Sequence, residues 1–480
     1  MDVSVLIPTY NRASLLPKVL DAWREVDQAT RYQYEIIFSD DGSSDNTIST
    51  LKEYGEGLPI VVLDNEHGGP ARARNTAIGH AKGDKVLIVG DDIFPNPQFV
   101  NQHHELSLKH GPETAILGEV KWHPDLELNY LMTHITEVGH EQFSFNAFPP
   151  NTYVDFRHFY TSNISVDRNL LLSEKILFDE RFYKVNFEDV ELGYRLSKKG
   201  LKILFDPKAY ADHYHPYEIE GFCKRQESAG EMAVVLIRLH PELDSIVGVT
   251  RTWERYAKFR ASRLAKIPTL NAGKTFDAVI KLCEAYEREL PNAMAREQRY
   301  IKLALSSIYS RLFRVFLELG MLNKLEPDNS DYKEYLAKVY FDAGGFWDSY
   351  IQAFNTFKDL GESDRLFREG LLGNQCLLTR GEMHLGLVDR APELVQSREL
   401  VLARKELDRI TGSYAWRIGS GIVYPAKVIR NLMRKLSNGG GNPSPSEENE
   451  SQDMENRAEA DAGIAKSRDS FDPVYRDAQI

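Results

Sequence analysis

The sequence predicts an α/β fold for about the first 240 residues, followed by an all-α domain and a disordered tail. Three observations lead to this prediction. Residues 1–118 alternate β-rich runs with stretches whose apolar residues recur at helical spacing. Residues 236–395 show the helical spacing alone. Residues 437–480 are rich in Gly, Pro and Ser, then acidic, and hold few large apolar side chains, so we expect no packed core there.

The alternation in the first 118 residues predicts a mostly parallel sheet with helices on both faces. We expect strands at 3–7, 34–39, 60–63, 84–89 and 114–117, and helices at 14–26, 44–54, 70–81 and 97–110. In such sheets, ligands bind at the carboxyl ends of the strands. The expected domains are 1–240 (the α/β domain), 241–395 (a helical domain of unknown role), 396–436 (a basic amphipathic segment) and 437–480 (a disordered acidic tail).

Composition excludes several classes of protein. The 480 residues are 42% hydrophobic, enough for a core, and the net charge of −12 argues against nucleic-acid binding. Cys223, Cys283 and Cys376 lie far apart, which fits a reducing compartment. The first residues lack the pattern of a signal peptide, and no run reaches the ~18 apolar residues of a membrane span. We therefore expect a cytoplasmic protein.

Polar clusters follow the first two expected strands. Pro8, Thr9, Tyr10 and Arg12 lie at the end of the first, and the Asp40–Asp41 pair ends the second. A carboxylate at this edge can accept a hydrogen bond from the N3–H of uracil or bind ribose hydroxyls. The alternative is an ordinary β-turn with a helix N-cap.

A third cluster, Gly68-Gly69-Pro70-Ala71-Arg72-Ala73-Arg74, opens a helix with glycines and cations. A helix N-terminus with arginines nearby suits a diphosphate. The alternative is a glycine-led helix start with solvated arginines.

The fourth expected strand ends in Gly90, Asp91 and Asp92. Carboxylates are hard ligands that suit Mg²⁺ or Mn²⁺, and such an ion can neutralise the charge on a leaving nucleotide. The alternative is a solvated turn.

Acidic residues also crowd the first turn of a helix at Glu188 and Asp189. One of them could be the general base for an acceptor hydroxyl, which is a weak nucleophile. Compensation of the helix dipole explains the same acids equally well. Farther along, His213 and His215 follow a strand-like run at 202–205, as candidate ligands or as structural histidines.

In this order, the clusters resemble the family-2 glycosyltransferases with the GT-A (Rossmann-like) fold, which act on nucleotide-diphospho-sugars. The resemblance runs from Val3 to about His240, and is specific because eight segments occur together: VSVLIPTYNR, SDDGSSDNT, GGPARARNTAI, VGDDIFPNP, TSNISVDRNLL, FDERF, FEDVELGYRLSKKG and ADHYHP.

The resemblance implies a role for each matching position. Asp92 would be the principal metal ligand, with His213 or His215 completing the site. Asp189 would be the catalytic base, with Glu188 as the second choice. The donor nucleotide would lie against the remaining residues, Pro8, Thr9, Tyr10, Arg12, Asp40, Asp41, Arg74 and Asp91.

Two departures from the family pattern are informative. Gly90 stands where the family's metal motif often has its first acid. No Gln-x-x-Arg-Trp motif, typical of processive synthases, follows the FEDVELGYRL segment, which favours addition of a single sugar.

Residues 407–436 resemble a C-terminal element of bacterial surface polysaccharide glycosyltransferases. From Gly412 to Leu436 they carry five basic residues, no acid, and interleaved aromatic and aliphatic side chains. Such a segment can bind the inner face of the cell membrane, or it can pack on the helical domain.

We therefore expect inverting, metal-dependent transfer from a nucleotide-sugar, by the resemblance a UDP-sugar, with Mg²⁺ or Mn²⁺, in polysaccharide biosynthesis. The acceptor would be a glycan, a lipid-linked sugar or a protein, and no nucleic acid is expected as a partner. The alternatives are a non-catalytic binding or assembly protein on a degenerate transferase scaffold, and a sugar nucleotidyltransferase.

Overall fold

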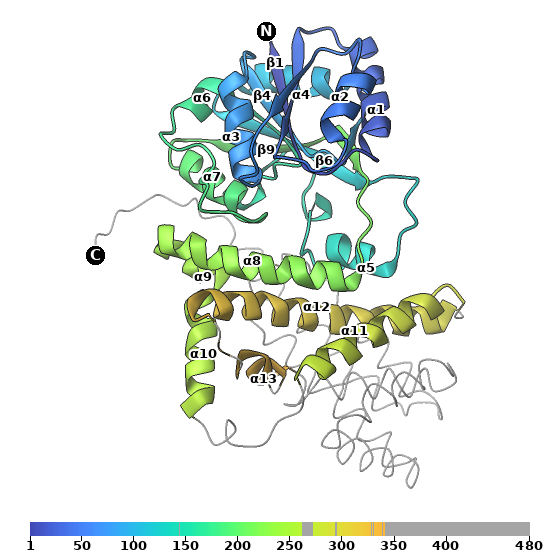
Figure 1. Ribbon diagram of the computed structural model, residues 1–480, viewed down its shortest axis with the longest axis vertical. Helices are drawn as coiled ribbons and strands as arrows, with labels where there is room; N and C mark the ends of the chain where they lie inside the picture. The colour runs from blue at the N-terminus through green and yellow to red at the C-terminus, as the bar shows by residue number, and fades with distance from the viewer. Residues whose placement is uncertain are drawn as a thin grey trace, which may run out of the picture. The chain divides into compact units, whose positions relative to one another are not determined.

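The structure is a computed structural model, and it describes residues 1–143, 145–261, 272–292, 295–327, 329, 331–337 and 339–340 (Figure 1). The expected segments 396–436 and 437–480 lie outside the described residues, as does the part of the expected helical domain beyond residue 340.

Within the described residues, nine strands form one sheet in the order β3-β2-β1-β4-β8-β6-β9-β5, and β7 also pairs with β9. The strands are β1 (Val3–Thr9), β2 (Tyr34–Asp40), β3 (Ile60–Asp64), β4 (Lys85–Val89), β5 (Ile93–Pro95), β6 (Thr114–Trp122), β7 (Thr152–Val154), β8 (Asn163–Asp167) and β9 (Lys202–His213).

The expectation of a mostly parallel sheet is confirmed: among the described residues, six of the nine strands run in one direction, namely β1, β2, β3, β4, β6 and β9. Strands β3, β2, β1 and β4 are parallel, and β6 is parallel to β9. Strand β8 runs antiparallel to β4 and β6, while β5 and β7 run antiparallel to β9. The α/β alternation that predicts parallel pairing stops after β6, so nothing in the sequence pattern of the later strands indicates their direction.

Helices cover the sheet and join its strands. Those of the α/β domain are α1 (Leu16–Ala29), α2 (Thr47–Tyr54), α3 (Pro70–His80), α4 (Phe99–His110), α6 (Arg168–Leu172) and α7 (Glu188–Ser197). Helix α2 begins three residues later than predicted, because the Asp45 carboxylate accepts hydrogen bonds from the amide and hydroxyl of Thr47 and forms a turn there. The core is built from β1, β2 and β4 with Trp23 of α1 and Phe99 of α4, both fully buried.

The helical region contains α8 (Ile219–Leu239), α9 (Asp244–Val247), α10 (Val249–Ala261), α11 (Ala272–Glu289), α12 (Ala295–Leu325) and α13 (Asp331–Ala337). Helices α8 and α12 run side by side (Figure 1) and pack at two glycines, Gly230 and Gly320. A Cβ atom at either glycine would overlap the backbone of the other helix. The predicted all-α region is therefore confirmed for its described residues up to 340.

A segment between β6 and β7 contacts this helical region. It holds α5 (Tyr130–Thr133) and the short helices η1 (His134–Val138) and η2 (Phe145–Ala147); η3 (Phe156–His158) precedes β8, and η4 (Pro241–Leu243) follows α8. The Glu287 carboxylate of α11 accepts hydrogen bonds from the backbone amides of Tyr130 and Leu131, at 2.8 and 2.6 Å. Helix α5 is thus capped by a side chain more than 150 positions away in the sequence.

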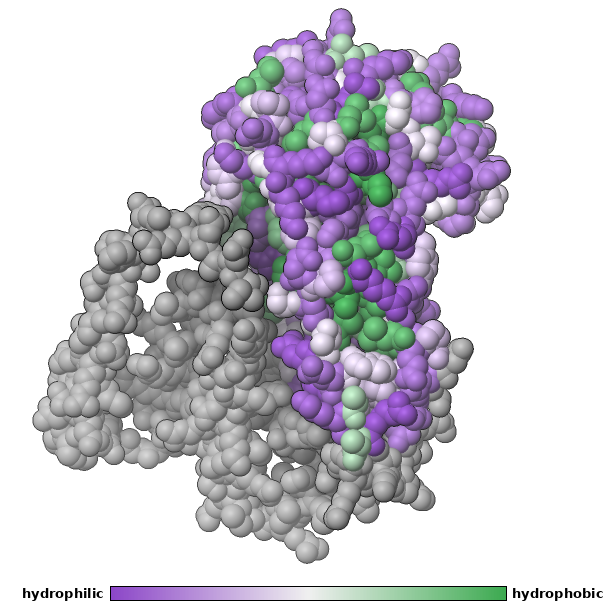
Figure 2. All heavy atoms as spheres, turned by 90° about the vertical axis from the view of Figure 1, so that its left-hand side faces the viewer, coloured by the Kyte–Doolittle hydropathy of each residue, from purple (hydrophilic) through white to green (hydrophobic). Residues whose placement is uncertain are grey.

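None of the helices among the described residues is long and apolar enough to cross a membrane. Figure 2 shows a face on which hydrophilic residues predominate over the α/β domain.

Candidate active site

The loop between β4 and β5 is a tight turn, Gly90–Asp92. A Cβ atom at Gly90 would lie 2.9 Å from Asp92 Oδ1. The absence of a side chain at this position therefore leaves room for the Asp92 carboxylate. A larger residue at position 90 would need only the end of the Asp92 side chain to shift, so this contact does not by itself require glycine.

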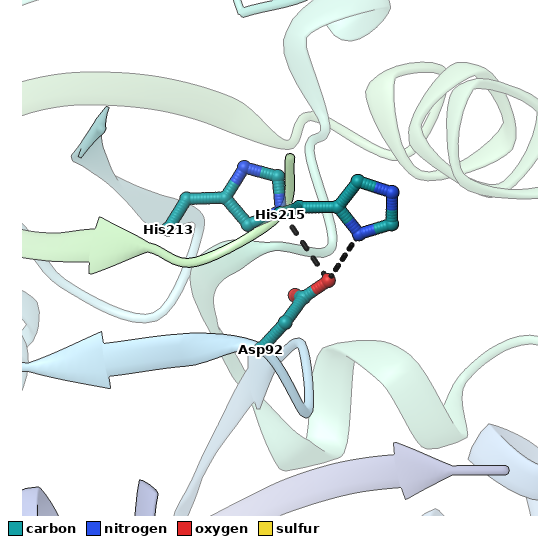
Figure 3. A group of neighbouring side chains, drawn as sticks. All are labelled: Asp92, His213 and His215. Atoms are coloured by element: carbon teal, nitrogen blue, oxygen red, sulfur yellow. Dashed lines mark hydrogen bonds and ion pairs between the residues drawn. The ribbon is translucent and has the colours of Figure 1, made fainter. Parts of the chain in front are cut away.

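Strand pairing brings two histidines to Asp92. His213 pairs with Ile93, the residue after Asp92, and the amide of Tyr214 donates to the Asp92 carbonyl across 2.8 Å. His215 lies two positions farther along the same chain segment. Figure 3 shows both rings directed at one carboxylate oxygen: Asp92 Oδ2 is 3.4 Å from His213 Nε2 and 3.1 Å from His215 Nδ1.

The ligand atoms of these three residues all lie within 4.8 Å of one another. One carboxylate oxygen and two imidazole nitrogens form a donor set that fits a divalent cation such as Mn²⁺. Burial works to raise the pKa of Asp92, but the two histidines outweigh it and hold that pKa well below its usual value. Asp92 is therefore ionised, as a metal ligand must be.

Asp91 faces a different partner. The Asp91 Oδ1 atom accepts a hydrogen bond from Arg12 Nε at 3.1 Å. Asp91 does not belong to the candidate cation site of Asp92, His213 and His215. Arg12 Nη2 also lies 3.6 Å from Asp92 Oδ2. Burial and the neighbouring Asp92 charge raise the pKa of Asp91 to about 6. Arg12 thus links the end of β1 to the acidic turn.

Of the two aspartates at the end of β2, Asp40 and Asp41, Asp40 is fully buried. Its oxygens accept hydrogen bonds from the amide and the hydroxyl of Ser43, at 2.8 and 2.5 Å. Asp40 therefore shapes the turn after β2, which is the local structural role that the sequence left open.

The Asp41 carboxylate ties β2 to the glycine loop. It accepts from the amides of Gly68 and Gly69, at 2.8 and 3.0 Å, and lies 3.0 Å from His67 Nδ1. The ring of Tyr10, which is 45% exposed, lies 4.9 Å from the His67 ring. Pro8 and Thr9 end β1 beside these loops, with the Thr9 side chain buried.

The two acids of α7 differ sharply in their surroundings. Glu188 is buried; its Oε1 accepts from Arg74 Nη1 at 2.8 Å, and its Oε2 accepts from the amide of Asn186 at 2.8 Å. Arg74 is thus paired with a protein carboxylate. Asn186 and Phe187, just before the helix, have φ of 114° and 67°, so the backbone that positions this turn is strained.

Asp189 is half-buried, and its Oδ1 accepts from the adjacent Val190 amide at 2.7 Å. Burial, and then the charge of Glu188, raise the pKa of Asp189 to about 7. A carboxylate with this pKa can take a proton near neutral pH, as a general base must. The structure thus distinguishes the surroundings of Glu188 and Asp189, which the spacing of residues along the helix could not do.

Several residues near these groups were not predicted. His67 contacts both Tyr10 and Asp41, Trp122 stacks on His213 at 5.5 Å, and Tyr217 lies 4.5 Å from His215, ring centre to ring centre. Only Tyr217 carried a sequence signal, because it follows the two histidines closely. The others come from loops and strand ends whose neighbours are set by the fold.

The sequence profile of the family Glycosyl transferase family 2 matches residues 4–177. The matched range contains Arg12, Asp41, Arg74 and Asp92 and ends before α7 and the two histidines.

Named relatives align with about half of the chain. A chondroitin synthase from Escherichia coli is 31% identical over 241 residues, covering 45% of this chain and 35% of the synthase. A validoxylamine A glucosyltransferase from Streptomyces hygroscopicus subsp. jinggangensis is 28% identical, covering 50% of this chain and 61% of that protein. The alignments therefore span about one third and three fifths of these relatives' lengths.

Two solved structures are also similar. A crystal structure of Staphylococcus aureus TarS 1-349 in complex with UDP has 19% identity and a TM-score of 0.38, covering 69% of this chain and 93% of that one. The mannosyltransferase PcManGT from Pyrobaculum calidifontis, in complex with GDP-Man and Mn²⁺, has 17% identity and a TM-score of 0.41, covering 68% and 88%. Because both scores are below one half, the sequence comparisons carry the assignment: residues 4–177 of the chain match Glycosyl transferase family 2, and about half of the chain is similar to each of the two named relatives.

Proposed function

We propose that this protein transfers one sugar, with inversion, from a UDP-sugar to a hydroxyl group of a glycan or other acceptor. The observation that carries the proposal is the convergence of Asp92, His213 and His215 on one point beside Arg12, in a family 2 domain. The names of the relatives support sugar transfer, and they support no single acceptor, because a synthase of chondroitin and a glucosyltransferase of validoxylamine A act on different molecules.

The donor would bind where the first two strands and the glycine loop meet. The exposed Tyr10 ring offers a stacking surface for a base, and Asp41 fixes the loop of Gly68 and Gly69 beneath it. Arg12 supplies positive charge close to the acidic turn. A divalent cation held by Asp92 and the histidines would neutralise charge on the diphosphate as the nucleotide leaves.

Asp189 is the group best suited to act as base. Its carboxylate would accept the proton of the acceptor hydroxyl, whose oxygen forms a bond to the anomeric carbon. The bond from that carbon to the diphosphate oxygen breaks, and the nucleoside diphosphate leaves with the electron pair. Attack opposite the leaving group inverts the anomeric configuration. Glu188 is less suited, because both of its oxygens already accept hydrogen bonds within the protein.

The test is release of UDP from a panel of UDP-sugars, with Mn²⁺ or Mg²⁺, measured with and without simple glycoside acceptors. Asp189→Asn should lower the rate at least about 100-fold, the lower end for loss of a general base. Asp92→Ala removes the carboxylate of the candidate cation site and should also lower the rate. Asp21→Asn is the matched control, because Asp21 is an exposed carboxylate on α1 whose side chain is 77% accessible.

Equal rates for wild type and both site variants, all folded, would contradict the proposed catalytic roles. Binding of UDP-sugars without any cleavage would instead favour the non-catalytic alternative. The product should carry a single added sugar of inverted configuration, which NMR of the anomeric proton can establish.

A further inference from the structure

The chain enters α7 through residues 182–187, the entry segment, which packs against helix α8. Phe182, the first residue of the segment, is fully buried and belongs to an apolar cluster with Met232 and Leu236 of α8. Phe187, the last residue, packs against the same cluster. The segment is therefore attached to the helical region at both of its ends.

A carboxylate of α8 also holds the entry segment. Glu231 Oε2 accepts a hydrogen bond from the Tyr183 hydroxyl at 2.8 Å, and Glu231 Oε1 accepts one from Lys184 Nζ at 2.6 Å. Both oxygens are thus used by neighbouring residues of the segment. Lys324 of α12 adds a further contact, because its Nζ donates to the Tyr183 hydroxyl at 3.2 Å. Two helices of the helical region therefore hold the chain that leads into α7.

The entry segment ends in strained backbone. Asn186 and Phe187 have φ of 114° and 67°, which residues other than glycine rarely adopt. Such conformations persist only where surrounding contacts fix them. Glu188 accepts from the Asn186 amide and fixes the end of the segment, whereas Glu231 fixes its beginning. Asp189 follows directly in the first turn of α7, so the direction of its carboxylate depends on these contacts.

From these contacts we infer that Glu231 is a positioning residue: through Tyr183 and Lys184 it keeps the entry segment in the conformation that directs Asp189 at the acceptor hydroxyl. The inference rests on the proposed function, in which Asp189 is the base. It gives the helical region a part in the reaction, because Glu231 lies on α8. A base displaced by ~1 Å can lose about 100-fold in rate, so a side chain that touches no substrate can still set kcat.

Three variants of the full chain remove the contact in steps. Glu231→Ala removes both acceptor oxygens, Glu231→Gln keeps one, and Tyr183→Phe removes a single hydroxyl. One matched control is Glu220→Ala, since Glu220 is an exposed glutamate of α8 that pairs with Lys224 on the same helix. The other is Tyr54→Phe, since Tyr54 on α2 has the same 46% exposure as Tyr183.

Kinetics of UDP release separate positioning from binding. In Glu231→Ala, kcat should fall roughly 10- to 100-fold while the KM for the UDP-sugar stays unchanged. Glu231→Gln should recover part of the loss. Adding Tyr183→Phe to Glu231→Ala should lower kcat no further, because the hydroxyl acts through the carboxylate. Both controls should match wild type.

Hydrogen exchange tests the anchoring without relying on activity. The amides of residues 183–189 should exchange faster in Glu231→Ala than in wild type, and Glu220→Ala should leave their exchange unchanged. Unchanged exchange in Glu231→Ala would show that Glu231 does not hold the segment, and it would overturn the inference.

Two kinetic results would also overturn it. A lower melting temperature with an unchanged kcat would mean that Glu231 serves stability alone. A higher KM for the UDP-sugar with an unchanged kcat would assign Glu231 to the loop of Gly68 and Gly69, because a Cβ atom at Gly69 would lie 3.3 Å from the Tyr183 carbonyl oxygen. The proposed function fails in a different way, when wild type releases UDP from none of the UDP-sugars.

Discussion

Arg74 and Glu188 form a buried ion pair, Nη1 to Oε1 at 2.8 Å, although they are 114 positions apart in the sequence. Arg74 lies on α3 and Glu188 begins α7, so the pair joins the two helices next to the candidate base. The guanidinium also lies 5.3 Å from the ring centre of Phe178. The pair holds the turn that carries Asp189 and influences the charge of that residue.

The pH dependence of activity should report the proton of Asp189. Because the base must be deprotonated and its pKa is raised to about 7, kcat/KM should rise with pH and level off above about pH 7. Rates of UDP release measured from pH 5 to 9 check this. A rising limb centred near pH 4, the range of an ordinary carboxyl group, would contradict the assignment.

Substitutions at Arg74 and at Glu188 should shift the midpoint of the pH–rate profile in opposite directions. Glu188 raises the pKa of Asp189 and Arg74 lowers it. Glu188→Gln should therefore shift the midpoint to lower pH, and Arg74→Met should shift it to higher pH. A purely structural pair would lower the rate of both variants without moving the midpoint.

The same variants should differ from wild type in stability. Removing one partner leaves a buried charge unpaired, at a cost of about 3–5 kcal/mol, whereas the double variant Arg74→Met/Glu188→Leu should recover much of it. Chemical denaturation measures the free energy of unfolding. Additive losses in the double variant would show that the two side chains do not interact energetically.

Mn²⁺ should activate the enzyme at lower concentration than Mg²⁺, because two of the three candidate ligand atoms are imidazole nitrogens. His215→Ala should weaken the dependence on Mn²⁺, and His80→Ala, an exposed histidine at the end of α3, should not. Thermal stabilisation by each metal, titrated in the presence of UDP, provides a second measure. Identical metal curves for His215→Ala and wild type would remove His215 from the ligand set.

Two glycines of α8 should respond oppositely to alanine. At Gly230 an added Cβ overlaps Leu317 O of α12, so Gly230→Ala should destabilise the helical region. At Gly221 nothing lies within 4 Å of the added Cβ, so Gly221→Ala should stabilise by roughly 0.5–1 kcal/mol through helix propensity. Melting temperatures of the two variants compare them directly, and equal shifts would mean that α8 and α12 do not pack this closely.

Loss of the Glu287 carboxylate should destabilise α5. Glu287→Ala leaves the amides of Tyr130 and Leu131 and the hydroxyl of Tyr309 without this acceptor, which should cost about 1–3 kcal/mol. Glu284→Ala, an exposed glutamate on the same helix, is the control. Hydrogen exchange should show faster exchange at 130–138 in Glu287→Ala alone, and unchanged protection there would refute the capping role.

The two acidic pairs are distinguished by their partners in the fold and not by their sequence. Asp91 and Asp92 are adjacent and chemically identical. Glu188 and Asp189 are also adjacent and chemically very similar. Position in the chain could place each pair at a strand end or a helix start. It could not indicate which member of a pair has which partner. The partners that distinguish them, Arg12, Arg74 and the two histidines, lie on other elements.

By itself, the sequence determined the α/β alternation, the helical region that follows and the strand-end positions of most candidate residues. These depend on local backbone preference and on the spacing of apolar residues, which act over a few positions. Only the tertiary structure decided the antiparallel direction of β8, the pairing of Arg74 with Glu188, the convergence of two histidines on Asp92 and the contact of Glu231 with the entry segment of α7. Each of these is a contact between residues tens to more than a hundred positions apart, chosen by packing and charge in the folded chain.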